Sequence, residues 1–449
     1  MMNKKMAQNL IEIKSIDQNS DKLIGIIFLP NNPFFIKDQP FYLKRLYGMS
    51  ILERNISVLN KNGIKKVFIF SNNLEDLNNA LNFDKNNLTK IKKIKSLHFV
   101  KEYLNQENLS NFILNYAIIL DGGVLIDDRI VSSLLNYEEE IIYTKGIKIQ
   151  ANYISKKQSK ILAGKVNLLD NTHILKKKEI SFNDLFYSLT LNKTIYHSSD
   201  EIDTYRPDMR RDLPLYFHSF RTHEDFKSAK KILVERTQKG TLDIIAWYFN
   251  RPLENIFVKL FANTKITANH ITILVNILAY IALILFLTQN WWIGLILLIF
   301  INIFDGVDGK LARLKNKESV VGHIEHSFDQ LFEQAIYVGV GLGAYFIIGQ
   351  FYVIIILIIM LLADSFNRHC SMQYKEIMQI TLADSSRLDQ LFRRFDGRRN
   401  IYTLHILIFG ILGHFEYVIF SICFHAIITS IVYSIQAIRH MKKADNLNK

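Results

Sequence analysis

The sequence predicts an α/β soluble domain followed by an all-α membrane domain of six spanning helices. Two observations predict this fold class. Of the 449 residues, 49% are hydrophobic, yet the long apolar runs lie after residue 265. Before residue 235, strand-like runs alternate with helix-like stretches, as in α/β folds. The chain therefore divides into a tail (1–20), a soluble domain (21–235), an amphipathic helix (240–265) and a membrane domain (266–440).

Three strand-like segments mark the soluble half. Apolar runs occupy residues 22–29, 64–71 and 116–120, and the last leads directly into Asp121. A helix-like stretch that ends near Gly63 separates the first two. Strands that alternate with helices in this way predict a mostly parallel sheet.

Residues 244–263 join the two halves. Aromatic and aliphatic residues alternate there with Arg251, Glu254 and Lys259. This pattern predicts a helix that lies in the cytoplasmic interface of the membrane, because it leads directly into the first span. The alternative is an amphipathic helix that packs on the soluble domain.

Six segments are apolar enough to cross a membrane, for which a helix needs about 20 residues. They lie near 268–288, 291–312, 322–348, 351–371, 401–416 and 417–438. Basic residues follow the second and sixth segments and precede the fifth, whereas the other connections contain no lysine or arginine. The positive-inside rule therefore predicts a multi-pass protein with both termini in the cytoplasm, together with the acidic connection between the second and third segments.

The net charge of +13 is compatible with nucleic-acid binding. The basic residues cluster, however, at the ends of the apolar runs, where they contact lipid headgroups and set orientation. No recognised nucleic-acid motif accompanies them. We expect membrane lipids as partners and no nucleic acid.

Acidic residues cluster where the second apolar segment ends. Asp305 and Asp308 are three residues apart, and Glu325 and Asp329 are four apart, so each pair lies on one helix face. Carboxylates beside a membrane span are expensive and usually mark function. Two such faces would form an oxygen-rich pocket for hard divalent cations. The alternative is a set of helix-end charges that pair with nearby basic residues.

These residues resemble the signature of the CDP-alcohol phosphatidyltransferases. The positions that match at the family spacing are Asp305, Asp308, Gly309, Ala312, Arg313 and Gly322. Counted without a gap, the last two aspartates of the signature fall on His326 and Gln330. A loop one residue shorter places Glu325 and Asp329 there, and we prefer this alignment because a metal pocket needs anionic ligands.

The resemblance implies an integral membrane enzyme that transfers a substituted phosphate from a CDP-alcohol to an acceptor hydroxyl and releases CMP. It implies two Mg²⁺ or Mn²⁺ ions held by Asp305, Asp308, Glu325 and Asp329. Asp329 is expected to be the base for the acceptor hydroxyl. The nucleotide and diphosphate are expected on Asp305, Gly309, Ala312, Arg313 and Gly322. His326 and Glu333 are expected to orient these groups, and the family's habit implies a homodimer.

Arginines precede the predicted fifth span. Arg398 and Arg399 could hold the phosphate of a phosphorylated acceptor, or could serve only as a positive-inside signal. In the predicted fourth span, Asp364 and Arg368 are four residues apart, which favours a structural ion pair.

The soluble half resembles the sugar-phosphate nucleotidyltransferases. The similar segments are Gly48–Arg54, Lys61–Val67, Asp121 after a buried strand, and residues 219–226. Where that family has a glycine-rich phosphate cradle, this chain has the prolines and aromatics of residues 30–40. Arg221 stands where the family has a second metal-binding aspartate. We therefore expect a degenerate domain without nucleotidyl-transfer activity, which could still bind a nucleotide.

The fusion of these two halves resembles bifunctional enzymes that make CDP-inositol and transfer its phosphoinositol group to inositol phosphate. Two functions are favoured over a transporter, for which the sequence shows no repeat of the acidic helices and no broken mid-membrane helix pair. One is a CDP-alcohol phosphotransferase of phospholipid or inositol-phosphate biosynthesis, and the alternative is a non-catalytic membrane scaffold with a degenerate site.

Overall fold

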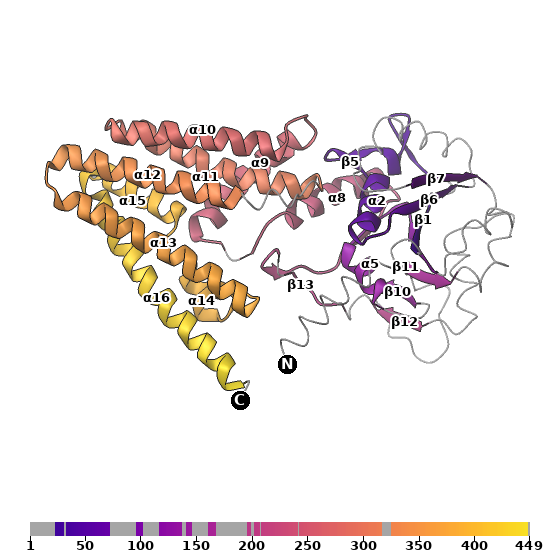
Figure 1. Cartoon of the computed structure of the whole chain (residues 1–449). Helices are drawn as coiled ribbons and strands as arrows, with labels where there is room; N and C mark the ends of the chain where they lie inside the picture. The colour runs from indigo at the N-terminus through magenta and orange to yellow at the C-terminus, as the bar shows by residue number, and fades with distance from the viewer. Residues whose placement is uncertain are drawn as a thin grey trace. The chain divides into compact units, whose positions relative to one another are not determined.

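The computed structural model describes residues 23–30, 33–71, 96–101, 116–136, 141–145, 160–167, 195–198, 202–206, 208–240, 242–316 and 325–447. The chain forms two compact units (Figure 1). The first comprises Met1–Thr204 and Leu213–Ile232, and the second comprises Tyr205–Asp212 and Leu233–Lys449. A short segment from within the soluble half therefore belongs to the membrane unit.

A seven-stranded sheet forms the centre of the first unit, in the order β12-β10-β11-β8-β1-β6-β7. The strands are β1 (Leu23–Phe28), β6 (Lys66–Ser71), β7 (Ser96–Lys101), β8 (Tyr116–Asp121), β10 (Ile141–Lys145), β11 (Lys160–Asn167) and β12 (Ile195–Ser198). All neighbouring pairs are parallel except those of β11, which runs antiparallel to β8 and β10. The predicted α/β unit with a mostly parallel sheet is confirmed.

Helix α2 (Ile51–Lys61) packs closely on the central strand β1. It begins with a capping box, in which the Ser50 side chain accepts from the Glu53 amide and the Glu53 carboxylate accepts from the Ser50 amide. Gly25 of β1 permits the close approach, because a Cβ there would lie 2.7 Å from Leu59 Cδ1. Among the described residues of this unit, the other α-helices are α5 (Asp128–Leu135) and α8 (His223–Arg236); the last residues of α8 belong to the second unit.

Helices form most of the second unit in its described residues. They are α9 (Arg251–Ala262), preceded by the π-helical turn η4 (Ala246–Asn250), α10 (Ala268–Leu287), α11 (Trp291–Leu314), α12 (Glu325–Ile348), α13 (Tyr352–Met378), α14 (Arg387–Phe392), α15 (Arg399–Ile411) and α16 (Val418–Leu447). A hairpin of β13 (Tyr205–Arg206) and β14 (Arg211–Asp212) belongs to the same unit. Gly339 lets α12 approach α10, since a Cβ there would lie 2.7 Å from the Leu283 carbonyl oxygen.

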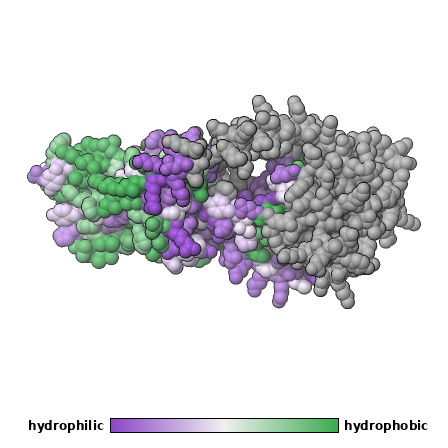
Figure 2. Space-filling model, turned by 90° about the horizontal axis from the view of Figure 1, so that it is seen from below, coloured by the Kyte–Doolittle hydropathy of each residue, from purple (hydrophilic) through white to green (hydrophobic). Residues whose placement is uncertain are grey.

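Five helices of the described residues are long and apolar enough to cross a membrane. They contain Ala268–Leu287, Trp291–Leu314, Ser327–Ile348, Tyr352–Met378 and Phe415–Asn446. Their exposed surface carries large apolar side chains, and Figure 2 shows such residues gathered over the helical unit. The predicted fifth span, 401–416, is instead the 13-residue helix α15. At 1.5 Å per residue this helix is about 20 Å long, less than the roughly 30 Å of a bilayer core.

Candidate active site at the ends of α11 and α12

The two acids of the signature lie in the last turns of α11. Asp308 is 4% exposed, and its carboxylate accepts a hydrogen bond from Thr272 Oγ1 of α10 at 2.8 Å. Asp305, one turn earlier, accepts a hydrogen bond from the guanidinium of Arg399 at the start of α15. The first acid of the signature is therefore ion-paired to a residue distant in sequence.

Arg399 lies between two carboxylates. Besides Asp305, it contacts the Glu333 Oε1 atom of α12 at 3.4 Å, and its guanidinium lies 5.1 Å from the ring centroid of Phe332. Glu333 in turn pairs with Arg368 of α13, whose Nε donates to Asp364 at 3.0 Å. Charges thus alternate through four helices, and the predicted ion pair of Asp364 with Arg368 is confirmed.

Asp329 lies on α12, one turn before Glu333. Its charge acts on both Asp305 and Arg399, so the three side chains lie within electrostatic range of one another. Residues Glu325 and His326 open α12, but their side chains and all of Gly322 lie outside the described part of the chain. The preferred alignment of Glu325 and Asp329 with the last two signature positions therefore stays a prediction.

The glycines and cations of the signature have local structural contacts. Arg313 Nε donates to the carbonyl oxygen of Thr237 at 2.8 Å, so the predicted phosphate-binding arginine contacts the backbone beyond α8. A Cβ at Gly309 would lie 3.3 Å from an Arg313 guanidinium nitrogen. The absence of a side chain at 309 therefore leaves room for that guanidinium. Ala312 lies beside Arg313 in the last turn of α11.

Two other residues of α11, the helix that carries the signature, contact α9. Lys310 Nζ lies 2.8 Å from a Glu254 carboxylate oxygen and donates to Asn255 Oδ1 at 2.8 Å. A Cβ at Gly306 would clash with the Glu254 carboxyl group. Burial raises the pKa of Glu254, and the neighbouring Lys310 ammonium partly offsets the shift. No sequence motif indicates that Gly306 and Lys310 contact the amphipathic helix α9.

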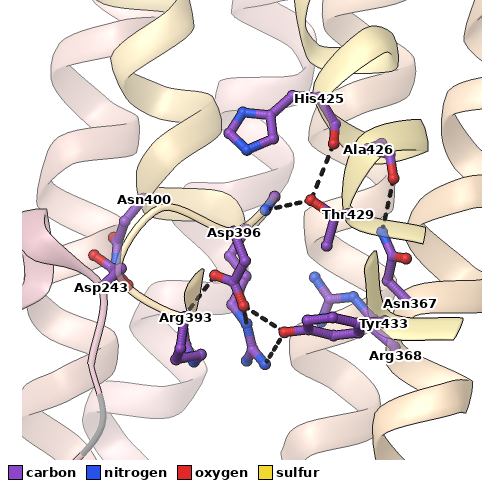
Figure 3. Close-up of polar contacts among 12 residues, drawn as sticks. Asp243, Asn367, Arg368, Arg393, Asp396, Asn400, His425, Ala426, Thr429 and Tyr433 are labelled. Carbon is purple, nitrogen blue, oxygen red and sulfur yellow. Dashed lines mark hydrogen bonds and ion pairs between the residues drawn. The ribbon is translucent and has the colours of Figure 1, made fainter. Parts of the chain in front are cut away.

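Arg398 organises the loop before α15. The buried carboxylate of Asp396 accepts from Arg398 Nε at 3.2 Å, from Arg393 at 2.9 Å and from the Tyr433 hydroxyl of α16 (Figure 3). Arg398 also donates to that hydroxyl at 3.3 Å. Of the two arginines predicted to bind an acceptor phosphate, the structure therefore places Arg399 beside the acids and Arg398 in the loop network.

The donor chemistry of the site fits a hard divalent cation, because Asp305, Asp308 and Asp329 all offer carboxylate oxygens. Among the residues whose side chains are described, no three acids, histidines or cysteines converge closely enough to form a metal site. The guanidinium of Arg399 supplies the positive charge at Asp305. A cation bound there would share or take over that charge-neutralising role.

Residues 265–381 match the family model of the CDP-alcohol phosphatidyltransferases. The second unit therefore contains a CDP-alcohol phosphatidyltransferase domain, the class of integral membrane transferase of substituted phosphate groups that the signature predicted. The matched range includes α10 to α13 and ends before α14. No curated protein matches the chain.

Solved structures are similar to each half. A putative glucose-1-phosphate thymidylyltransferase from Bacillus anthracis has 13% identity and a TM-score of 0.34, over 47% of this chain and 94% of that one. HddC from Yersinia pseudotuberculosis has 12% identity and a TM-score of 0.32, over 46% and 98%. A phosphatidylinositol phosphate synthase from Mycobacterium tuberculosis, solved with CDP-DAG bound, has 16% identity and a TM-score of 0.34, over 41% and 94%.

Proposed function

We propose that the membrane unit transfers a substituted phosphate group from a CDP-alcohol to an acceptor hydroxyl and releases CMP. The observation that carries this proposal is the family match over residues 265–381, which includes the helix end with Asp305 and Asp308. The nearby charges of Asp329 and Arg399 support it, since phosphoryl transfer needs both a base and cationic groups.

In this proposal Asp305, Asp308, Glu325 and Asp329 hold Mg²⁺ or Mn²⁺. Such ions, when bound, would neutralise charge that develops on the diphosphate as CMP leaves. Asp329 accepts the proton of the acceptor hydroxyl. Gly309, Ala312, Gly322 and Arg313 form the nucleotide side of the site, where Arg313 exchanges its bond to Thr237 for a phosphate oxygen.

We assign the acceptor side to Arg399 rather than to Arg398. The guanidinium of Arg399 forms ion pairs with both Asp305 and Glu333, so it is held in one orientation beside the acids. Arg398 is bound to Asp396 and Tyr433, which fits a role in loop structure. A phosphorylated acceptor would then approach from the α15 side of the site.

The proposed membrane arrangement keeps both termini and the active site in the cytoplasm, with a homodimer as the assembly. Helix α9 and the preceding turn lie in the interface, which their exposed apolar residues support. Tyr248 is 72% exposed, Ile256 59% and Leu260 61%, values that suit contact with lipid better than contact with water. The donor is either a lipid such as CDP-diacylglycerol or a soluble compound such as CDP-inositol.

The test is a screen of CMP release by the purified protein with Mg²⁺ or Mn²⁺. Donors would be CDP-diacylglycerol and CDP-inositol, each with a panel of hydroxyl acceptors. We expect one donor–acceptor pair to support CMP release. Asp305→Asn and Asp329→Asn should abolish this release. The control Asp445→Asn, at an exposed position near the end of α16, should leave it unchanged. Full CMP release by both site variants would overturn the proposal.

The second candidate is a non-catalytic scaffold. The ion pair between Asp305 and Arg399 favours it, because that pair neutralises the first acid without a metal ion. A scaffold predicts no CMP release from any donor and no change in thermal stability when CDP-alcohol and Mg²⁺ are added together.

A further inference from the structure

The segment that joins α8 to α9 contacts α11 and α15, two of the helices that carry the candidate site. We call its residues 242–250 the strap. The Ile244 amide of the strap donates to the Arg394 carbonyl oxygen at 3.1 Å, in the loop before α15. Thr237, shortly before the strap, accepts the hydrogen bond from Arg313 of α11. The segment therefore contacts both α11 and the approach to α15.

Asn400 is the point where the strap contacts α15 itself. Its Nδ2 donates to Asp243 Oδ2 at 3.0 Å, and its Oδ1 accepts from Asn250 Nδ2 at 3.2 Å. Figure 3 shows Asp243 on the strap directly beside Asn400 at the start of the helix. Asp243 and Asn250 are each 3% exposed. Both ends of the Asn400 amide are thus bound to buried strap residues.

Asp243 is itself fixed by the strap. Its other carboxylate oxygen, Oδ1, accepts from the Ala246 amide at 2.7 Å, one turn further along the strap. A buried carboxylate with defined donors on both oxygens has a single favoured orientation. The orientation of Asp243 therefore fixes the position of Asn400.

The first turn of α15 depends on such external bonds. Within the described part of the chain, the N-cap residue Arg398 makes no capping hydrogen bond with its side chain. The turn is tied to α11 by Asn302, whose Nδ2 donates to Thr403 Oγ1 at 2.9 Å. Thr403 in turn donates to the Arg399 carbonyl oxygen at 2.7 Å. Asn400 adds a second tie, to the strap.

We propose that the strap, through Asp243, Asn250 and Asn400, positions Arg399 between Asp305 and Glu333. Asn400 follows Arg399 directly in the first turn, so holding one residue restrains the other. This inference rests on the proposed function, because it makes the strap a determinant of phosphotransfer. A displacement of about 1 Å at a reacting centre can reduce turnover by up to about a hundredfold. The three strap-contact residues are positioning residues, since none of them touches the acids of the site.

The chain offers a reciprocal exchange as a test. In Asn400→Ala all the side-chain bonds to the strap are lost. In the double variant Asp243→Asn with Asn400→Asp, the new asparagine can donate to the new aspartate and still accept from Ala246. The new aspartate can still accept from Asn250. The exchange therefore restores the network with donor and acceptor reversed, whereas Asn400→Asp alone sets two carboxylates against each other.

Hydrogen exchange of the full-length protein in detergent measures the restraint without relying on activity. We expect amides of residues 402–404, the first of α15 with acceptors in the preceding turn, to exchange about tenfold faster in Asn400→Ala, as expected for the loss of one or two hydrogen bonds. The exchange variant should return them to the wild-type rate, and Asn290→Ala, at an exposed asparagine beside the other end of α11, should not change them. Unchanged rates in Asn400→Ala, or no recovery in the exchange variant, would overturn the inference.

Turnover gives the second readout. With a donor that supports CMP release, we expect kcat to fall about tenfold in Asn400→Ala with little change in the KM for the donor, and to recover in the exchange variant. A full kcat in a variant whose first turn exchanges faster would show that the strap does not position Arg399 for catalysis. Absence of CMP release from the wild-type protein would refute the proposed function, while hydrogen exchange would still decide whether the strap restrains α15.

Discussion

The guanidinium of Arg399 and the carboxylate of Asp305 form an ion pair between residues 94 positions apart in the chain. The pair joins the motif helix α11 to α15 and places a cation among the acids of the candidate site. Because Arg399 also contacts Glu333, its position is defined from two sides. Proteins commonly bind phosphate groups with a guanidinium that is held in one orientation in this way.

Replacing Arg399 by lysine tests whether the planar guanidinium group is needed for CMP release. Lysine keeps the charge but cannot bond Asp305 and Glu333 together, because its ammonium is a point charge on a flexible stem. We expect Arg399→Lys to reduce CMP release by about tenfold or more and to raise the KM for a phosphorylated acceptor. Steady-state kinetics over a range of acceptor concentrations would measure both effects. Arg394→Lys is the control, since its backbone rather than its side chain contacts the strap.

Asp329 and Glu333, one turn apart, are expected to differ in role. Asp329→Asn should reduce CMP release by about a hundredfold or more, as expected for loss of a general base, with little change in thermal stability. Glu333→Gln should lower thermal stability, because Arg368 and Arg399 both lose a charged partner. Thermal unfolding and CMP release, measured on the same preparations, separate the two. Equal activity losses with equal stability losses would contradict the assignment of Asp329 as base.

The sequence predicts those parts of the site in which the contacting residues lie on the same helix. The i,i+3 spacing of Asp305 and Asp308 places both acids on the last turns of α11, and the structure confirms that helix. The spacing of Asp364 and Arg368 likewise predicts their ion pair, because both residues lie on one helix. Local periodicity is sufficient where the partners are neighbours on the same element.

Contacts between distant helices carry no such periodic signal. Three side-chain hydrogen bonds join segments that are distant in the sequence, and each depends on the packing of the whole unit. They are the bonds of Arg399 with Asp305, Asn400 with Asp243, and Thr272 with Asp308. The predicted fifth span, 401–416, also differs from α15, because the apolar run continues past Ile411, where the helix ends before a short 3₁₀ turn at Phe415–Tyr417. Hydropathy counts apolar residues but does not detect that interruption.

The buried pair of Glu254 and Lys310 is expected to couple α9 to the motif helix. Removal of one partner leaves a buried charge alone, so Glu254→Gln and Lys310→Met should each destabilise the protein by about 3 kcal/mol. The double variant should recover much of that loss, because both charges are then gone. Thermal unfolding of the four proteins gives the coupling as a double-mutant cycle. Additive losses would show that the two residues act independently, despite their 2.8 Å contact.

The interfacial position of α9 can be measured with spin labels. In a chain whose Cys370 and Cys423 are replaced by alanine, a label at Ile256→Cys should be accessible to oxygen and shielded from a water-soluble nickel reagent after reconstitution in vesicles. A label at Lys231→Cys, an exposed position of α8, should show the reverse. Equal access of the nickel reagent to both labels would favour the alternative in which α9 lies away from the membrane.

The soluble unit is expected to lack nucleotidyl-transfer activity, because aromatic residues occupy the loop after β1. The rings of Phe34 and Phe41 stack with centroids 4.7 Å apart, and Phe41 is 3% exposed. The Phe41 ring centroid also lies 5.8 Å from that of Phe220, next to Arg221, so the three rings form an aromatic cluster. Such a loop cannot present the row of backbone N–H groups that holds a triphosphate.

The protein should therefore form no CDP-inositol and no pyrophosphate from CTP and inositol phosphate, assayed with Mg²⁺ by chromatography. Preparations that release CMP in the phosphotransfer assay serve as the control for folded protein, and CTP-dependent formation of pyrophosphate that Asp121→Asn abolishes would contradict the prediction.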